Sequence, residues 1–108
     1  MPELSTVLSE LYATLEARRG ADPAGSYVAS LFARGDDAIL KKIGEEAAET
    51  LIAAKNGERE ALVHELADLW FHTLVLMAHR DVPLQALADE LARRFAQSGH
   101  AEKVARGR

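Results

Sequence analysis

The stretch Lys42-Ile43-Gly44-Glu45-Glu46-Ala47-Ala48-Glu49, followed by Glu65-Leu66-Ala67-Asp68, decides how this chain folds. Within each stretch the carboxylates recur at intervals of three or four residues, which places them on one side of a helix. Two such helices packed side by side would gather the acids into one pocket. We therefore expect two long antiparallel helices with a functional site between them.

The composition also favours a wholly helical protein. The chain has 108 residues, no cysteine and three prolines, and it is rich in Ala, Leu, Glu and Arg, which are good helix formers. This length indicates one domain, residues 1–108, small enough that dimerisation would help to bury apolar surface. The lack of cysteine excludes disulfides and thiolate metal ligands. We find no signal segment or membrane span and expect a cytoplasmic protein.

The net charge of −4 says little against an anionic substrate, because several of the acids belong to the two clusters and a bound metal would neutralise them. It does disfavour a partner such as duplex nucleic acid, whose binding surfaces are basic.

Residues typical of helix starts and helix ends divide the chain into about five predicted helices. An apolar stripe from Leu4 to Leu15 predicts the first helix, which Gly20 ends. Ser26 is expected to cap a short second helix that ends at Gly35. The next two are the long helices. Asp36 or Asp37 is predicted to cap the first, which runs through Asn56 and is stopped by Gly57. The second is predicted to run from about Glu58 to His79.

The end of the sequence predicts a fifth helix and a tail. The fifth helix follows Pro83, and its predicted buried stripe consists of Leu84, Leu87, Leu91 and Phe95. Residues 97–108 are small and basic, and we expect them to form a flexible tail that orders on binding.

The acids do not read as an ordinary solvated face. One narrow stripe of the first long helix carries Lys42, Glu45, Glu46 and Glu49. A second polar strip on that helix can face solvent, so the acid stripe is expected to face another helix. On the next helix, Glu65 and Asp68 share an arc with His72 and have no Lys or Arg beside them. A single acidic stripe is usually solvated, but two on consecutive helices favour a site.

Converging carboxylates repel one another, and a hard cation such as Mg²⁺ relieves the repulsion. The predicted ligands are Glu46, Glu49, Glu65 and Asp68. Glu45 either binds a second ion or orients a water. His72 is more often a supporting residue than a ligand in such a setting, and Lys42 is either an ion-pair partner of the acids or a phosphate contact.

These residues resemble the phosphoribosyl-ATP pyrophosphatase family nearly end to end. The acid motif itself is common to all MazG-type nucleotide pyrophosphatases, so it indicates the superfamily and the metal. The flanking elements are those of the narrower family, and Phe71 replaces the tyrosine expected beside His72. The matching segments are Ser26-Tyr27 through Leu31-Phe32 and Gly35, Lys42 to Glu49, Glu65 to Leu69 with His72, and Ser98-Gly99 through Glu102-Lys103.

The resemblance implies a MazG-like helical bundle whose site is completed in a homodimer or larger assembly. It also implies hydrolysis of phosphoribosyl-ATP to phosphoribosyl-AMP and pyrophosphate, the second step of histidine biosynthesis. In that reaction Glu45, Glu46 and Glu49 are the catalytic acids. The phosphate contacts are Lys42 first, then Lys41, Arg34 and Lys103. The chain lacks the cysteines and the length for the zinc cyclohydrolase of the next step, which we expect on a separate polypeptide.

Two other interpretations stay open from the sequence. One is a nucleoside triphosphate pyrophosphatase of the same superfamily that acts on dUTP or dCTP. The other is a helical dimerisation module without catalysis, which predicts no dependence on metal.

Overall fold

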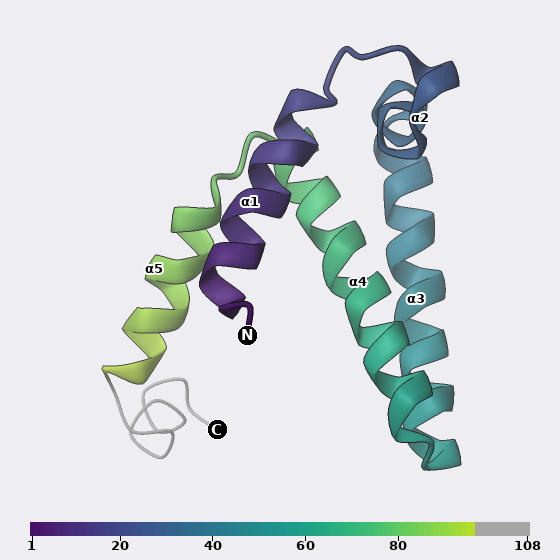
Figure 1. Cartoon of the computed structure of the whole chain (residues 1–108), viewed down its shortest axis with the longest axis vertical. Helices are drawn as coiled ribbons and strands as arrows, with labels where there is room; N and C mark the ends of the chain where they lie inside the picture. Colours follow the sequence, from purple (N-terminus) through teal and green to yellow (C-terminus); the bar gives the residue numbers. More distant parts are fainter. Residues whose placement is uncertain (97–108) are drawn as a thin grey trace, which may run out of the picture.

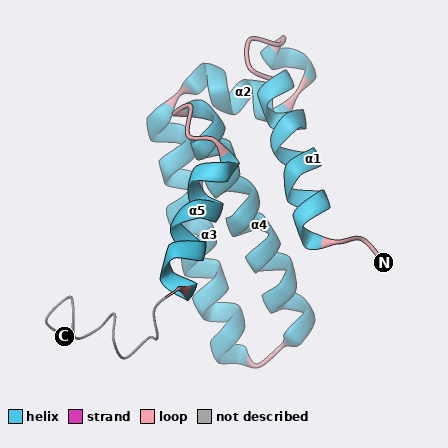
Figure 2. Cartoon of the chain, turned by 90° about the vertical axis from the view of Figure 1, so that its left-hand side faces the viewer, coloured by secondary structure: helices cyan, strands magenta, loops and turns pink. Residues whose placement is uncertain are grey.

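A computed structural model describes residues 1–96, which form an all-α, MazG-like bundle (Figures 1 and 2). The predicted five helices are confirmed within these residues. α3 and α4 run antiparallel and side by side, α2 contacts both of them away from the turn that joins them, and α1 packs on α4. The helices are α1 (Leu4–Ala17), α2 (Tyr27–Arg34), α3 (Asp36–Asn56), α4 (Arg59–His79) and α5 (Leu84–Phe95), with a 3-10 turn at Pro23–Gly25.

Local signals set the start of α2 and the end of α3. The Ser26 hydroxyl accepts a hydrogen bond from the Ala29 N–H at 3.2 Å and caps α2 as predicted. Gly57 ends α3 in the left-handed conformation, with a φ of 73°. The predicted aspartate cap of α3 is wrong, because Gly35 occupies that position and joins α2 to α3 directly. Asp36 lies in the first turn, and its carboxylate binds Arg80 instead.

The apolar core lies at the end of the α3–α4 pair where α1 and α2 join it. Polar contacts close the same end: the Tyr12 hydroxyl donates to the Val82 carbonyl at 2.5 Å, and Arg19 forms an ion pair with Asp81. The acids therefore lie along the part of the pair that the core does not reach. The buried residues that form this cluster are Tyr12, Leu15, Leu31, Ile39, Leu74, Val75 and Ala78.

The prediction of a buried stripe on α5 is wrong for the chain by itself. Leu84 is half-buried, but Leu87 and Leu91 are exposed and Phe95 is 92 % exposed. The reason is that α5 diverges from the α3–α4 pair and leaves its apolar face over a hollow of about 450 Å³ between α1, α4 and α5. Trp70 of α4 borders this hollow and is 48 % exposed, so it is not a core residue.

Among residues 1–96, α4 alone is long and apolar enough to cross a membrane by length and composition. Central helices of folded domains meet the same criterion, and α4 carries Glu65 and Asp68 while packing against three other helices.

Candidate active site

Three carboxylates from the two long helices meet in the middle of the α3–α4 pair. Glu46 and Glu49 extend from α3, Glu65 extends from α4, and one oxygen of each lies within 4.8 Å of the others. The spacing of three residues puts Glu46 and Glu49 on the side of α3 that faces α4. We call these three residues the acid cluster.

The acid cluster is unsatisfied in a way that points to a cation. Glu46 is only 5 % exposed, and within residues 1–96 no hydrogen-bond partner reaches its Oε2 atom or the buried Oε2 atom of Glu65. A buried carboxylate oxygen without a partner is costly, and a hard cation with oxygen ligands removes that cost. The donor set, which consists of oxygen atoms alone, fits Mg²⁺.

Crowding of negative charge also perturbs protonation in the acid cluster. Contact with the Glu65 carboxylate raises the pKa of Glu49, and burial adds to this effect, while Glu46 and Lys42 oppose it. Two carboxylates this close cannot both be charged without repulsion. The predicted conflict among the acids is therefore present at Glu49.

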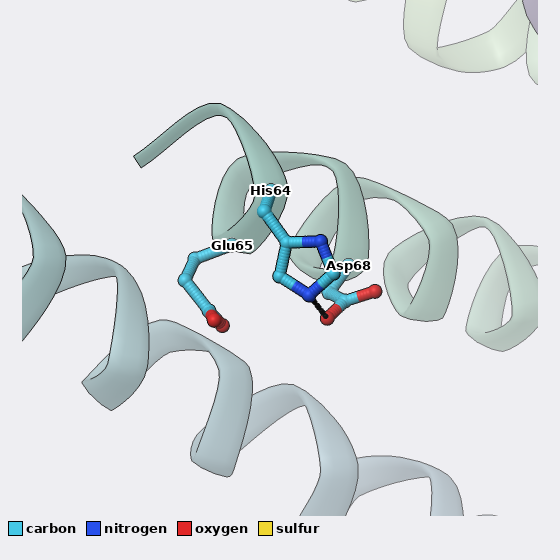
Figure 3. Close-up of side chains that lie close together, drawn as sticks. All are labelled: His64, Glu65 and Asp68. Carbon is cyan, nitrogen blue, oxygen red and sulfur yellow. Dashed lines mark ion pairs between the residues drawn. The ribbon is translucent and has the colours of Figure 1, made fainter. Parts of the chain in front are cut away.

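Asp68 lies beside the acid cluster and shares Glu65 with it. Asp68, Glu65 and His64 offer ligand atoms within 4.8 Å of one another, and the His64 Nε2 atom lies 3.4 Å from the Asp68 Oδ2 atom (Figure 3). His64 was missed in the sequence analysis, although its spacing of four residues from Asp68 on one helix is a usable signal.

Lys42 sits at the other edge of the acid cluster. Its Nζ atom lies 3.4 Å from Oε1 of Glu45 and 3.4 Å from Oε1 of Glu46. Burial opposes its charge, but Tyr27 and the two carboxylates outweigh burial and raise the pKa of Lys42. Lys42 is thus an ion-pair partner of the acids in this structure. Glu45 is exposed on the Lys42 side and belongs to neither group of candidate ligands.

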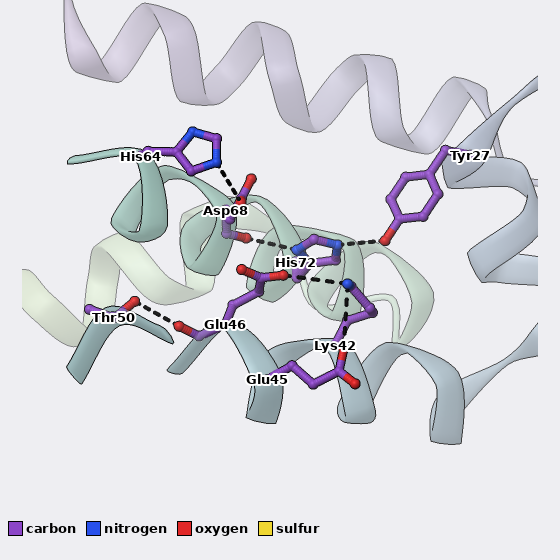
Figure 4. A network of polar contacts seen from close by, with 8 residues as sticks. All are labelled: Tyr27, Lys42, Glu45, Glu46, Thr50, His64, Asp68 and His72. Atoms are coloured by element: carbon purple, nitrogen blue, oxygen red, sulfur yellow. Dashed lines mark hydrogen bonds and ion pairs between the residues drawn. The ribbon is translucent and has the colours of Figure 1, made fainter. Parts of the chain in front are cut away.

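His72 is a buried residue of α4 one turn after Asp68, and it belongs to neither group of candidate ligands. It is 5 % exposed, and its Nδ1 atom donates to the main-chain carbonyl of Asp68 at 2.8 Å. Its Nε2 atom lies 2.8 Å from the Tyr27 hydroxyl (Figure 4). Phe71, in place of the expected tyrosine, packs edge-on against the His72 ring. The role of Tyr27 as a polar partner was not foreseen.

The remaining predicted phosphate contacts are placed less closely. Arg34 ends α2 and Lys41 lies on α3, both exposed. Lys103 lies outside the described residues. A pocket of about 240 Å³ opens beside the acid cluster, and its lining consists of Glu49, Ile52, Ala53, Asn56, Ala61 and Glu65. This pocket leaves the Glu49 and Glu65 side of the acid cluster open.

Known proteins resemble this chain over most of its length. The sequence matches the family "Phosphoribosyl-ATP pyrophosphohydrolase" over residues 8–95. It is 53 % identical to a phosphoribosyl-ATP pyrophosphatase of Geobacter sulfurreducens over 98 % of both chains. Identity is 49 % to one of Nitrosomonas eutropha, covering 98 % of this chain and 91 % of the relative, and 50 % to one of Neisseria gonorrhoeae, covering 94 % of each. The chain therefore belongs to the phosphoribosyl-ATP pyrophosphohydrolase family of hydrolases.

Proposed function

We propose that this protein hydrolyses phosphoribosyl-ATP to phosphoribosyl-AMP and pyrophosphate, the second step of histidine biosynthesis, as a soluble enzyme of the cytoplasm. The single observation that carries the proposal is the acid cluster, in which the buried Glu46 carboxylate has an unpaired oxygen beside Glu49 and Glu65. A phosphate-cleaving enzyme needs such a site to bring a cation to an anionic substrate.

Mg²⁺ is the proposed cofactor, and its proposed ligands are Glu46, Glu49, Glu65 and Asp68. When bound, the ion would neutralise charge that develops on the phosphate oxygens during displacement. Its affinity should depend on pH, because the carboxylates must lose their protons to bind it. Contact with Glu65 raises the pKa of Glu49, so Glu49 should contribute to that dependence as the pH falls.

The other side chains would position the substrate and the water. Glu45 lies outside both ligand groups, which supports a role in orienting the water that attacks phosphorus in line with the pyrophosphate leaving group. Lys42 lies beside Glu46 and is the main proposed phosphate contact. Arg34, Lys41 and Lys103 are further candidates for the separated phosphates of phosphoribosyl-ATP.

We also propose a homodimer. Exposed apolar side chains on α1, α4 and α5 surround the hollow that α5 leaves open, and a second copy would cover them. The proposal includes no nucleic acid and no membrane as partners.

The test is pyrophosphate release from enzymatically prepared phosphoribosyl-ATP, with and without Mg²⁺, with dUTP, dCTP and ATP assayed in parallel. We expect Mg²⁺-dependent release with strong preference for phosphoribosyl-ATP. Preferred turnover of dUTP or dCTP would replace the proposed substrate while keeping the metal. No turnover of any of the four would favour a helical module without catalysis.

A further inference from the structure

The two hydrogen bonds of the His72 ring determine which atoms donate and which accept at the edge of the site. The Asp68 carbonyl can only accept, so the proton of the His72 ring lies on Nδ1. In the neutral ring, Nε2 then carries a lone pair and accepts. The Tyr27 hydroxyl therefore donates its proton to His72 across 2.8 Å (Figure 4).

This direction leaves the Tyr27 oxygen as an acceptor without a proton to give. A substrate phosphate also only accepts, so the Tyr27 oxygen cannot hydrogen-bond it directly. A cation between the two would bind both. Lys42 is suitably placed, because its ammonium points toward the Tyr27–His72 hydrogen bond in Figure 4.

Lys42 needs such an acceptor once the acid cluster is engaged. In this structure its Nζ atom lies 3.4 Å from one oxygen each of Glu45 and Glu46. Glu46 is also part of the acid cluster, so a cation there would compete with Lys42 for its carboxylate. An oxygen that does not belong to the acid cluster would keep Lys42 from moving away.

The Tyr27 oxygen is held firmly enough for this role. Tyr27 is the first residue of α2, and the Ser26 cap fixes the start of that helix. The ring of Tyr27 meets the buried His72 ring edge-on, with centroids 5.9 Å apart. Half of the Tyr27 residue is nonetheless exposed. Its position is therefore set by α2 and α4, while Lys42 comes from α3.

We propose that Tyr27, oriented by His72, is a positioning residue that holds the Lys42 ammonium toward the substrate phosphate. The inference rests on the proposed function only for the identity of that substrate. The competing explanation is that Tyr27 and His72 merely dock α2 on α4.

The first measurement is independent of activity. The ¹⁵N shifts of the His72 ring in the metal-free protein report which nitrogen carries the proton. We expect protonated Nδ1 and unprotonated Nε2 in the neutral ring. A proton on Nε2 would overturn the proposal, because the Tyr27 hydroxyl would then be free to donate to a phosphate itself.

The second measurement is a double-mutant cycle of kcat/KM with Tyr27→Phe, Lys42→Met and the double variant. We expect Tyr27→Phe to lower kcat/KM by about ten-fold in the natural background and by less than about two-fold when Lys42 is absent. An equal loss in both backgrounds would overturn the proposal, since a docking role does not need Lys42. If Lys42→Met is too slow to assay, calorimetric binding of inorganic pyrophosphate with Mg²⁺ replaces the rate in the same cycle.

Tyr12→Phe is the matched control. It removes a tyrosine hydroxyl that also makes a long-range hydrogen bond, to the Val82 carbonyl away from the acids. It should lower Tm while kcat/KM stays within about two-fold. If the natural protein does not cleave phosphoribosyl-ATP, the proposed function fails, while the ring shifts and the pyrophosphate cycle still decide the role of Tyr27.

Discussion

Carboxylates of the α3–α4 pair lie in two different settings, which differ in how their charge is balanced. Near α2, the Asp36 carboxylate of α3 accepts hydrogen bonds at 2.7 and 2.5 Å from the guanidinium of Arg80, the residue that follows α4. This contact is the main cause that lowers the pKa of Asp36. In the middle of the same pair, Glu46 and Glu49 meet Glu65, and the pKa of Glu49 is raised.

The difference separates a structural contact from a site. The Asp36–Arg80 pair is complete within the chain and needs no ligand. The acid cluster holds more negative charge than Lys42 offsets, and two of its buried oxygens have no partner among residues 1–96. The apolar core, at the end of the α3–α4 pair where α1 and α2 join it, stabilises the fold and so keeps these acids together despite their repulsion. We therefore expect the acid cluster to lower the stability of the metal-free protein while allowing it to bind a cation. We expect neither effect from the Asp36–Arg80 pair.

The largest expected effect follows Glu49→Gln in the acid cluster. Loss of a metal ligand should lower kcat/KM by roughly 10²–10³-fold, because several kcal/mol of charge stabilisation depend on the bound ion. The Tm of the metal-free protein should rise or stay unchanged, since a repelling charge is gone. Steady-state kinetics and thermal unfolding with a chelator measure the two effects. Glu10→Gln, at an exposed position of α1, is the control and should change neither.

A large fall in the Tm of Glu49→Gln would contradict this comparison. It would mean that Glu49 contributes to folding as Asp36 does, and that the acid cluster is a structural feature.

Mg²⁺ itself should stabilise the protein through the acid cluster alone. A ligand at about 100 times its Kd adds about 2.7 kcal/mol to the free energy of unfolding, which corresponds to a rise in Tm of roughly 10 °C for a domain of this size. The rise should disappear in Glu46→Gln and persist in Arg80→Ala. A thermal-unfolding series with Mg²⁺ and the three proteins tests this, and an equal rise in all three would place the binding elsewhere.

The sequence predicts the features of this structure that depend on residues close together in the chain. Helix limits at Ser26 and Gly57 were predictable because a cap depends on adjacent residues. The convergence of Glu46, Glu49 and Glu65 followed from helical spacing and from the turn that makes α3 and α4 neighbours.

Features that depend on distant packing were not predictable in this way. The Tyr27–His72 hydrogen bond joins residues 45 positions apart and requires α2 to lie on α4. The sequence predicts Asp36 or Asp37 as the cap of α3, and it does not reveal that Asp36 pairs with Arg80, which is 44 positions away. Periodicity identifies the apolar stripe of α5. It does not show whether the surface that packs against this stripe belongs to the same chain or to another one.

The pH dependence of the metal-free protein should distinguish the two places by sign. A raised pKa means that the contribution of Glu49 to stability is present below its ordinary pKa of 4.5 and is lost as the pH rises through the raised value. The advantage in Tm of Glu49→Gln over the natural protein should therefore be largest near about pH 7 and shrink toward about pH 4. Thermal unfolding at several pH values with a chelator measures this advantage. An advantage that grows as the pH falls would contradict the assignment.

The smallest expected effect belongs to the closed pair at the other end. The lowered pKa of Asp36 means that its contribution is present above its ordinary value of 3.8 and is lost as the pH falls through the lowered one. Both partners are partly exposed, so Arg80→Ala should lower Tm by no more than roughly 4 °C near neutral pH, with kcat/KM within about two-fold. Asp36→Asn is the matched variant, and its deficit in Tm should vanish at acid pH, where the natural carboxylate is protonated as well. If Arg80→Ala reduced activity as strongly as Glu49→Gln does, the pair would be positioning the acid cluster through the rigid helices, and the two places would not be independent.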